Sequence, residues 1–195
     1  MAFALSGQRR IMKRQILFIQ GGGPGAHKTD ESLVEYLRSV LGASYQVHYP
    51  TMPNEEDPEY GRWRVRITKE LTVLAGDVIL IGHSLGGSFL LKYLSEEKAD
   101  TAIAGIFLIA APYWGGNGWR YEGYERIALR EDFVSKLPTE VPLCLYHSRD
   151  DEIVPFAHLN LYAEKLPAAA IRVVEGRGHQ FTNNLSEVVA DLTSL

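Results

Sequence analysis

The chain of 195 residues predicts a single domain and argues against two. With 20 Lys and Arg against 24 Asp and Glu, the net charge of −4 excludes the strongly basic surface expected of a nucleic-acid-binding protein. The only cysteine, Cys144, excludes an internal disulfide. Because it stands in the apolar run VPLCLY, we expect a buried structural thiol in a reducing compartment.

The N-terminal residues give no periodic pattern, and their basic side chains follow a very short apolar patch, the reverse of a secretory signal. We therefore expect a flexible tail over 1–11 and one domain over 12–195. No segment reaches the roughly 20 apolar residues of a membrane helix. The expectation is a cytoplasmic protein without a membrane or nucleic-acid partner.

Short β-branched runs alternate along the chain with helix-length amphipathic stretches. The predicted strands are 16–20, 45–49, 78–82, 103–110, 142–147 and 171–175. The predicted helices are 31–41, with Asp30 as its N-cap, 59–74, 85–98, 156–166 and 185–192. The exception is 112–140, which is rich in Gly, Tyr and Trp before an amphipathic piece near 124–137. This alternation predicts an α/β fold with a doubly wound, mainly parallel sheet of about six strands.

The first strand leads into the loop QGGGPG, residues 20–25. Its Gly21, Gly23 and Ala26 also fit the G-x-G-x-x-A pattern of dinucleotide-binding proteins, which makes a nucleotide-binding βαβ protein one alternative. That function needs an acidic residue at the end of the second strand, where the sequence reads VHYP. The missing acid disfavours nucleotide binding.

The third strand runs directly into GHSLG, residues 82–86, and a helix-length stretch follows. A sharp turn there would raise the Ser84 side chain out of the strand, and Gly82 and Gly86 would avoid collisions within the turn. The Leu85 N–H and the positive end of the following helix would then face an oxygen bound at Ser84. Ser84 is thus the candidate nucleophile, and a simple helix N-cap is the alternative.

Two later loops carry acidic and histidine residues: SRDDEIVP, residues 148–155, follows the fifth strand, and GRGHQF, residues 176–181, follows the last. Together with GHSLG, they resemble the α/β-hydrolase family, and in particular the compact serine hydrolases related to the retinoblastoma-binding hydrolase. The resemblance covers about 15–192. The family's order of nucleophile, acid and base implies a triad of Ser84, Asp151 and His179.

In such a triad, His179 takes the proton of the serine hydroxyl, and Asp151 fixes the tautomer of the imidazole and stabilises its charged form. Neighbouring Asp150 remains an alternative for the acid, and capping of the loop is its other expected role. The other histidines are expected to be surface or strand-end residues: His27, His48, His83, His147 and His158.

The resemblance also implies an oxyanion hole formed by the Leu85 N–H and a second N–H from the glycine loop, either Gly22 or Gly23. The family's usual histidine before these glycines is absent, and Gln20 or Gly21 stands in its place, so the choice between the two donors stays open. With one cysteine and no H-E-x-x-H pair, we expect no metal, and nothing in the sequence implies a cofactor.

The implied reaction is hydrolysis of a small carboxylic ester, a thioester or an amide through an acyl-Ser84 intermediate. The stretch 112–140 is too short for a large lid, which predicts an open site. Aromatic residues there, together with His83, are candidates to line a pocket for a small acyl substrate, or simply to hold the loop down: Tyr113, Trp114 and Trp119. The alternative from another functional class is a non-catalytic interaction module on a hydrolase scaffold.

Overall fold

A computed structural model describes residues 13–98, 100–116, 119–120 and 122–195. The expected tail, 1–11, lies outside the described residues. Among those described, no helix is long and apolar enough to cross a membrane.

Six parallel strands form one sheet, as the sequence predicts, and the structure shows their order to be β2-β1-β3-β4-β5-β6. The strands are β1 (Arg14–Ile19), β2 (Tyr45–His48), β3 (Val78–His83), β4 (Ile103–Ile109), β5 (Leu143–Ser148) and β6 (Ala170–Val174). Central β3 is buried along its whole length, because helices cover both of its faces. Edge strand β6 has two exposed residues out of five.

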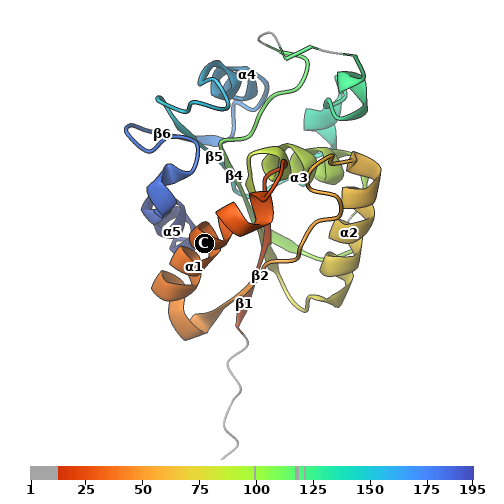
Figure 1. Ribbon diagram of the computed structural model, residues 1–195. Helices are drawn as coiled ribbons and strands as arrows, with labels where there is room; N and C mark the ends of the chain where they lie inside the picture. The colour runs from red at the N-terminus through yellow and green to blue at the C-terminus, as the bar shows by residue number, and fades with distance from the viewer. Residues whose placement is uncertain (1–12, 99, 117–118, 121) are drawn as a thin grey trace, which may run out of the picture.

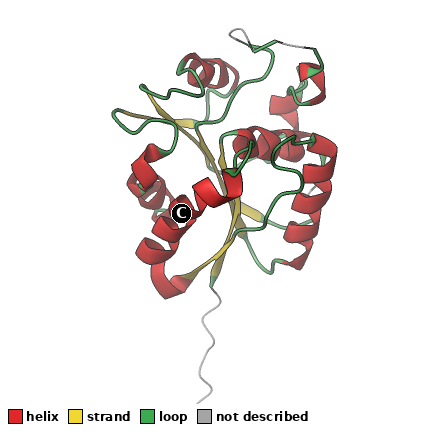
Figure 2. Ribbon diagram, viewed as in Figure 1, coloured by secondary structure: helices red, strands yellow, loops and turns green. Residues whose placement is uncertain are grey.

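Five helices cover the two faces of the sheet: α1 (Ala26–Leu41), α2 (Tyr60–Val73), α3 (Leu85–Glu96), α4 (Ala157–Lys165) and α5 (Ser186–Thr193). Alternate residues of each strand point to opposite faces. One core cluster contains buried residues of α2, α3 and α4, and the other contains buried residues of α1 and α5. Figures 1 and 2 show the resulting three layers, with α1 and α5 on one side of the strands and α2 and α3 on the other.

Two of the predicted elements are wrong in detail. Helix α1 begins at Ala26 and not at residue 31, because Gly25 in a left-handed conformation, φ 73°, turns the chain directly into the helix. Asp30 is therefore no N-cap, and lies within α1 with a buried side chain. The predicted amphipathic piece 124–137 is two short 3-10 helices, η2 (Tyr124–Arg126) and η3 (Phe133–Lys136).

Parallel strands place their carboxyl ends at one edge of the sheet. The register pairs Ile19 with Gly82, His83 with Ile109 and Ser148 with Val174. The loops after β1, β3, β4, β5 and β6 therefore leave the sheet on the same side, where ligands of open α/β sheets bind. Cys144, within β5, is buried as expected.

Candidate active site

Ser84 lies in the turn between β3 and α3, with φ 51° and ψ −125°. Such a conformation costs a non-glycine residue about 1–3 kcal/mol and persists only where the surroundings hold it. Here the Ser84 N–H donates to the Ile109 carbonyl of β4 at 2.8 Å, and the Ser84 carbonyl accepts from the Gly87 N–H at 3.0 Å. The side chain stays partly exposed although both neighbouring residues are buried.

The glycines flanking Ser84 are required by close backbone approach, as the sequence predicts. A Cβ at Gly82 would lie 2.6 Å from the Gly87 Cα, and a Cβ at Gly86 would lie 2.2 Å from the Gln20 carbonyl oxygen. The start of α3 is therefore in direct contact with the end of β1. This contact brings the glycine loop over the turn, where a Cβ at Gly21 would lie 3.3 Å from the Ser84 Cβ.

The backbone N–H groups of the glycine loop differ in their hydrogen bonds. The Gly21 N–H donates to Asp30 Oδ2 at 2.8 Å, and the Gly23 N–H donates to the Glu55 carbonyl at 2.6 Å. The Gly22 N–H has no acceptor among the described residues. Gly22 also packs against Leu85, because a Cβ there would lie 2.5 Å from Leu85 Cδ2. Leu85 is the first residue of α3, so its N–H has no acceptor within the helix.

Asp151 and His179 form a hydrogen-bonded pair at the same edge. The His179 Nδ1 lies 3.0 and 2.9 Å from the two carboxylate oxygens of Asp151, whose side chain is fully buried. The Asp151 carboxylate also accepts the Ile153 and Val154 N–H groups at 2.9 and 2.8 Å. Burial alone would raise the pKa of Asp151, but hydrogen bonds from His147, His179 and the backbone hold it well below the usual value. Asp151 is therefore ionised.

The two acids beside Asp151 hold the backbone of the loop that follows β6, residues 176–181, which contains His179 and is called the histidine loop below. Asp150 is exposed, and its carboxylate accepts the Ser148 hydroxyl and the Arg177 N–H, the latter at 3.2 Å. Glu152 accepts the His179 N–H at 3.0 Å. Loop capping was the other role expected of Asp150, and these contacts agree with it. The sequence analysis missed the role of Glu152, whose only signal was its place in a run of three acids.

Three of the other histidines are buried and hydrogen-bonded. His83 and His147 lie at strand ends, as the sequence analysis expected, whereas His158 lies in α4 and is neither a surface nor a strand-end residue. His147 is 1% exposed and donates from Nε2 to the Val154 carbonyl at 2.8 Å. His158 is fully buried, and its Nδ1 accepts the Tyr113 N–H at 2.9 Å. His83 is 2% exposed and contacts Asp30, so its side chain faces the interior.

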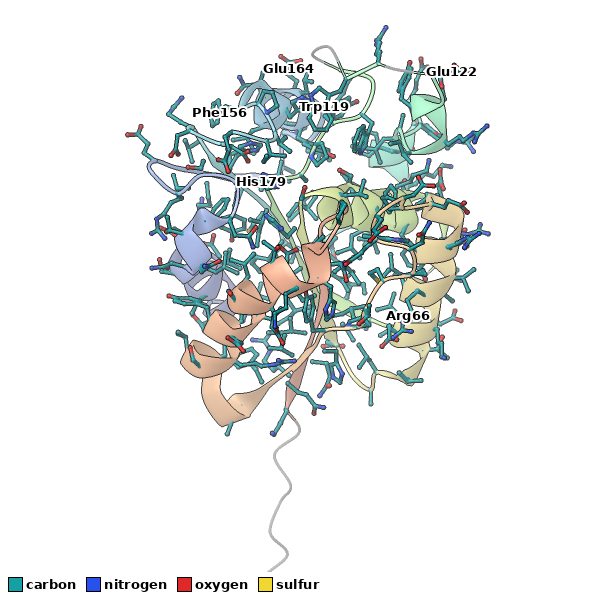
Figure 3. All side chains as sticks on the ribbon, in the orientation of Figure 1. Arg66, Trp119, Glu122, Phe156, Glu164 and His179 are labelled. Atoms are coloured by element: carbon teal, nitrogen blue, oxygen red, sulfur yellow. The ribbon has the colours of Figure 1, made fainter. Side chains whose placement is uncertain are left out.

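The aromatic segment after β4 packs against α4 and on itself. Tyr113 contacts Tyr162 edge to face, and Trp119 lies between Trp114 and His158, with ring centroids 4.9 and 4.8 Å away. In Figure 3, Trp119 lies above His179, in the upper part of the molecule with α4. Tyr113 and Trp114 also line a cavity of about 550 Å³ that is open to solvent.

A second cavity, of about 460 Å³, lies between the start of α2 and η2 and is lined by Pro58, Tyr60, Arg126 and Ile127, among others. It borders the glycine loop, because Pro58 Cγ would lie 3.1 Å from a Cβ at Gly22. Within the described part of the chain, no group of three or more His, Cys, Asp and Glu side chains is arranged to hold a metal.

Comparison with known proteins identifies a family that the chain matches and several proteins of similar structure. Residues 29–184 match the family described as Serine hydrolase. The putative hydrolase YdeN of Bacillus subtilis (strain 168) is 23% identical over 175 residues, which cover 86% of each chain. The lysosomal phospholipase A and acyltransferase of Bos taurus is 32% identical over 100 residues, 48% of this chain. This chain spans about a quarter of the length of the first curated relatives that it matches.

Solved structures share the fold over nearly the whole chain. The ydeN gene product of B. subtilis superposes with a TM-score of 0.73 at 21% identity, covering 93% of this chain and 98% of that one. Est1E from Butyrivibrio proteoclasticus gives a TM-score of 0.69 at 16% identity, covering 96% of this chain and 88% of that one.

Proposed function

The chain belongs to the serine hydrolase family, and from this premise we propose that it hydrolyses a small carboxylic ester through an acyl-Ser84 intermediate, with Asp151 and His179 completing a catalytic triad. The observation that carries the proposal is the buried, ionised Asp151 bonded to His179 Nδ1, at the edge where the strained turn presents Ser84. Thioesters and amides are the other substrates of the same mechanism. Esters come first because their leaving groups depart most easily.

The Asp151–His179 bond supports the assignment of the base. Because both carboxylate oxygens face Nδ1, the proton of neutral His179 resides there, and Nε2 is left as an acceptor. In the proposed reaction, His179 Nε2 takes the Ser84 hydroxyl proton as Oγ attacks the acyl carbon, then returns it to the leaving alkoxide. Water repeats the sequence on the acyl-enzyme and releases the acid.

The hydrogen-bond pattern of the glycine loop supports Gly22 as the second oxyanion donor. The Gly23 N–H already donates to Glu55, whereas Gly22 lies against Leu85 with its N–H unused among the described residues. Two N–H groups, from Gly22 and Leu85, would then stabilise the charge that develops on the carbonyl oxygen. One such donor contributes about 3–4 kcal/mol to the transition state.

The names of the relatives agree with acyl chemistry, since the cattle protein is called a phospholipase A and acyltransferase and the B. subtilis protein a putative hydrolase. Transfer of an acyl group to water is the reaction that we propose here. The cavity bordered by Pro58 and Tyr60, next to Gly22, is the proposed position for part of the substrate.

A fluorophosphonate tests the proposal without a guess about the substrate, because it requires only an activated serine. Intact mass should show one adduct on the wild type and none on Ser84→Ala. Ser95→Ala, a partly buried serine whose hydroxyl donates to Lys92 of the same helix, should keep the adduct. Absence of an adduct on folded wild type would overturn the proposal in favour of a non-catalytic scaffold.

A further inference from the structure

A second buried histidine–carboxylate pair lies next to the proposed triad. Asp30 of α1 and His83 of β3 are each 2% exposed, and His83 Nδ1 lies 2.9 Å from the Asp30 carboxylate. The two residues are 53 positions apart in the sequence. The proposed mechanism gives neither of them a role.

Asp30 collects donors from three separate segments. Its carboxylate accepts the Gly21 N–H of the glycine loop at 2.8 Å, the His83 ring, and the Gln180 Nε2 of the histidine loop at 2.9 Å. A carboxylate has two acceptor oxygens and no donor, so it can serve all three at once. Burial raises the pKa of Asp30, but its bonds with His83, Gln180 and Gly21 outweigh burial and lower it, so the group is ionised.

His83 faces an acceptor on each side of its ring. The Nδ1 faces Asp30, and the Nε2 lies 3.1 Å from the His179 carbonyl oxygen. Both nitrogens therefore act as donors, which requires the charged imidazolium. Burial alone would lower the pKa of His83, but the charge and hydrogen bond of Asp30, the His179 carbonyl and the more distant Asp151 raise it. The His83 and His179 rings are also in contact, with centroids 4.9 Å apart.

Three residues bonded in this cluster are sequence neighbours of groups in the proposed mechanism. Gly21 precedes Gly22, His83 precedes Ser84, and Gln180 follows His179. The fourth bond reaches His179 itself, through its carbonyl. Figure 3 shows His179 on the loop that follows β6, near the end of α1 that carries Asp30.

We propose that Asp30 and His83 are positioning residues that fix the oxyanion donor and the catalytic base relative to Ser84. This inference rests on the proposed function. The physical reason is that reactive groups must be held to within a fraction of an ångström, and a shift of 1 Å costs about 100-fold in rate. The buried, charged Asp30–His83 pair connects the glycine loop, the turn that contains Ser84 and the histidine loop through its hydrogen bonds.

Substitutions at His83 separate hydrogen bonding from packing. In His83→Gln, the side-chain amide nitrogen reaches the position of Nε2 and keeps the bond to the His179 carbonyl. In His83→Leu, the volume is similar but no donor remains. With 4-nitrophenyl acetate as substrate, we expect kcat to fall about 100-fold in His83→Leu with KM within threefold of wild type, and to recover about tenfold in His83→Gln.

Gln180→Ala provides a milder variant, because it removes only one donor from a partly exposed position. We expect kcat to fall three- to tenfold with an unchanged melting temperature. Asp191→Asn is the matched control: this carboxylate also accepts several bonds, from Tyr146 and Arg172, but on α5 away from the site. It should lower the melting temperature and leave kcat and KM within twofold of wild type.

Fluorophosphonate labelling of the wild type separates the two proposals, since an unlabelled wild type would refute the proposed function itself. If the wild type is labelled and hydrolyses the ester, equal kcat in His83→Leu and His83→Gln would show that packing alone matters and would overturn the positioning role. The same conclusion would follow if Gln180→Ala kept the wild-type kcat. The positioning role would be supported if, among the variants that fold, kcat fell further as more hydrogen-bond donors were removed.

Discussion

The contact between α3 and β1 gives a matched pair of glycine substitutions. Gly86 and Gly61 are each the second residue of a helix, α3 and α2 respectively. A Cβ at Gly86 would lie 2.2 Å from the Gln20 carbonyl oxygen and 2.4 Å from that of Ile19, whereas nothing lies within 4 Å of a Cβ at Gly61. The same change, glycine to alanine, should therefore have opposite effects at the two positions.

In Gly61→Ala the helix gains propensity, and we expect the free energy of unfolding to rise by about 0.5–1 kcal/mol. In Gly86→Ala the helix must move from β1 by roughly 0.8 Å, since Cβ contacts under about 3 Å do not occur. Overpacking of a rigid interior costs about 1–3 kcal/mol, which corresponds to a fall of about 2–12 °C in Tm for a protein of this size.

The same movement should affect hydrolysis, because it separates Leu85 from the glycine loop. We expect kcat/KM for 4-nitrophenyl acetate to fall by about 10- to 100-fold in Gly86→Ala and to stay within twofold in Gly61→Ala. Urea unfolding followed by circular dichroism gives the stability of both variants. If Gly86→Ala were as stable and as active as Gly61→Ala, the close approach of α3 to β1 would not constrain the site, and the reasoning would be refuted.

Two further predictions concern the acids and histidines of the site. Asp151→Asn should lower kcat by about 10³- to 10⁴-fold, because an amide no longer holds the required His179 tautomer, while Asp150→Asn should stay within about tenfold; similar losses would contradict the choice of Asp151. Since the pKa values of Asp30 and Asp151 are lowered by folding, their contribution to stability is present above about pH 4 and lost as the pH falls through the folded values. Folding raises the pKa of His83, so its effect on stability has the opposite pH dependence. Its contribution to stability is fully present below about pH 6.5 and is lost as the pH rises through the pKa of the folded state. Urea midpoints from pH 3 to 9 should therefore be highest between about pH 4.5 and 6.5, and an alkaline decline as steep in His83→Leu as in wild type would contradict the assignment to His83.

The sequence predicted the sheet well because its central strands are buried on both faces. Strand β3, for example, begins with four apolar residues, Val78 to Ile81, which Gly82 follows. Such a pattern is local, so the predicted strand ends lie within two residues of those observed. The turn at Ser84 could also be predicted from a local pattern, because the strand, the two glycines and the helix are contiguous in the sequence. The choice of Asp151 and His179 depended on family order and remains a proposal.

The features that the sequence did not predict depend on contacts between distant segments. Asp30 has the residue type of an N-cap, and only the left-handed Gly25 moves the helix start back so that Asp30 becomes buried against His83. A periodic pattern predicts only the faces of a single helix or strand, so it cannot predict a contact between residues 53 positions apart. The stretch 124–137 has the apolar spacing of a helix, but the chain forms two short 3-10 helices there, in which Phe133 is the one buried residue.

Backbone strain is concentrated on the loops that the proposed reaction uses. Of seven non-glycine residues with positive φ in the described part of the chain, five lie at this edge: Ser84, Ala110, Phe181, Thr182 and Asn183. Such conformations cost a non-glycine residue about 1–3 kcal/mol. The Ala110 N–H donates to the Tyr146 carbonyl at 2.8 Å, and Phe181 is fully buried. The buried sheet thus stabilises conformations that isolated loops would not keep, and the Asp30–His83 pair adds the polar bonds that connect these loops to one another.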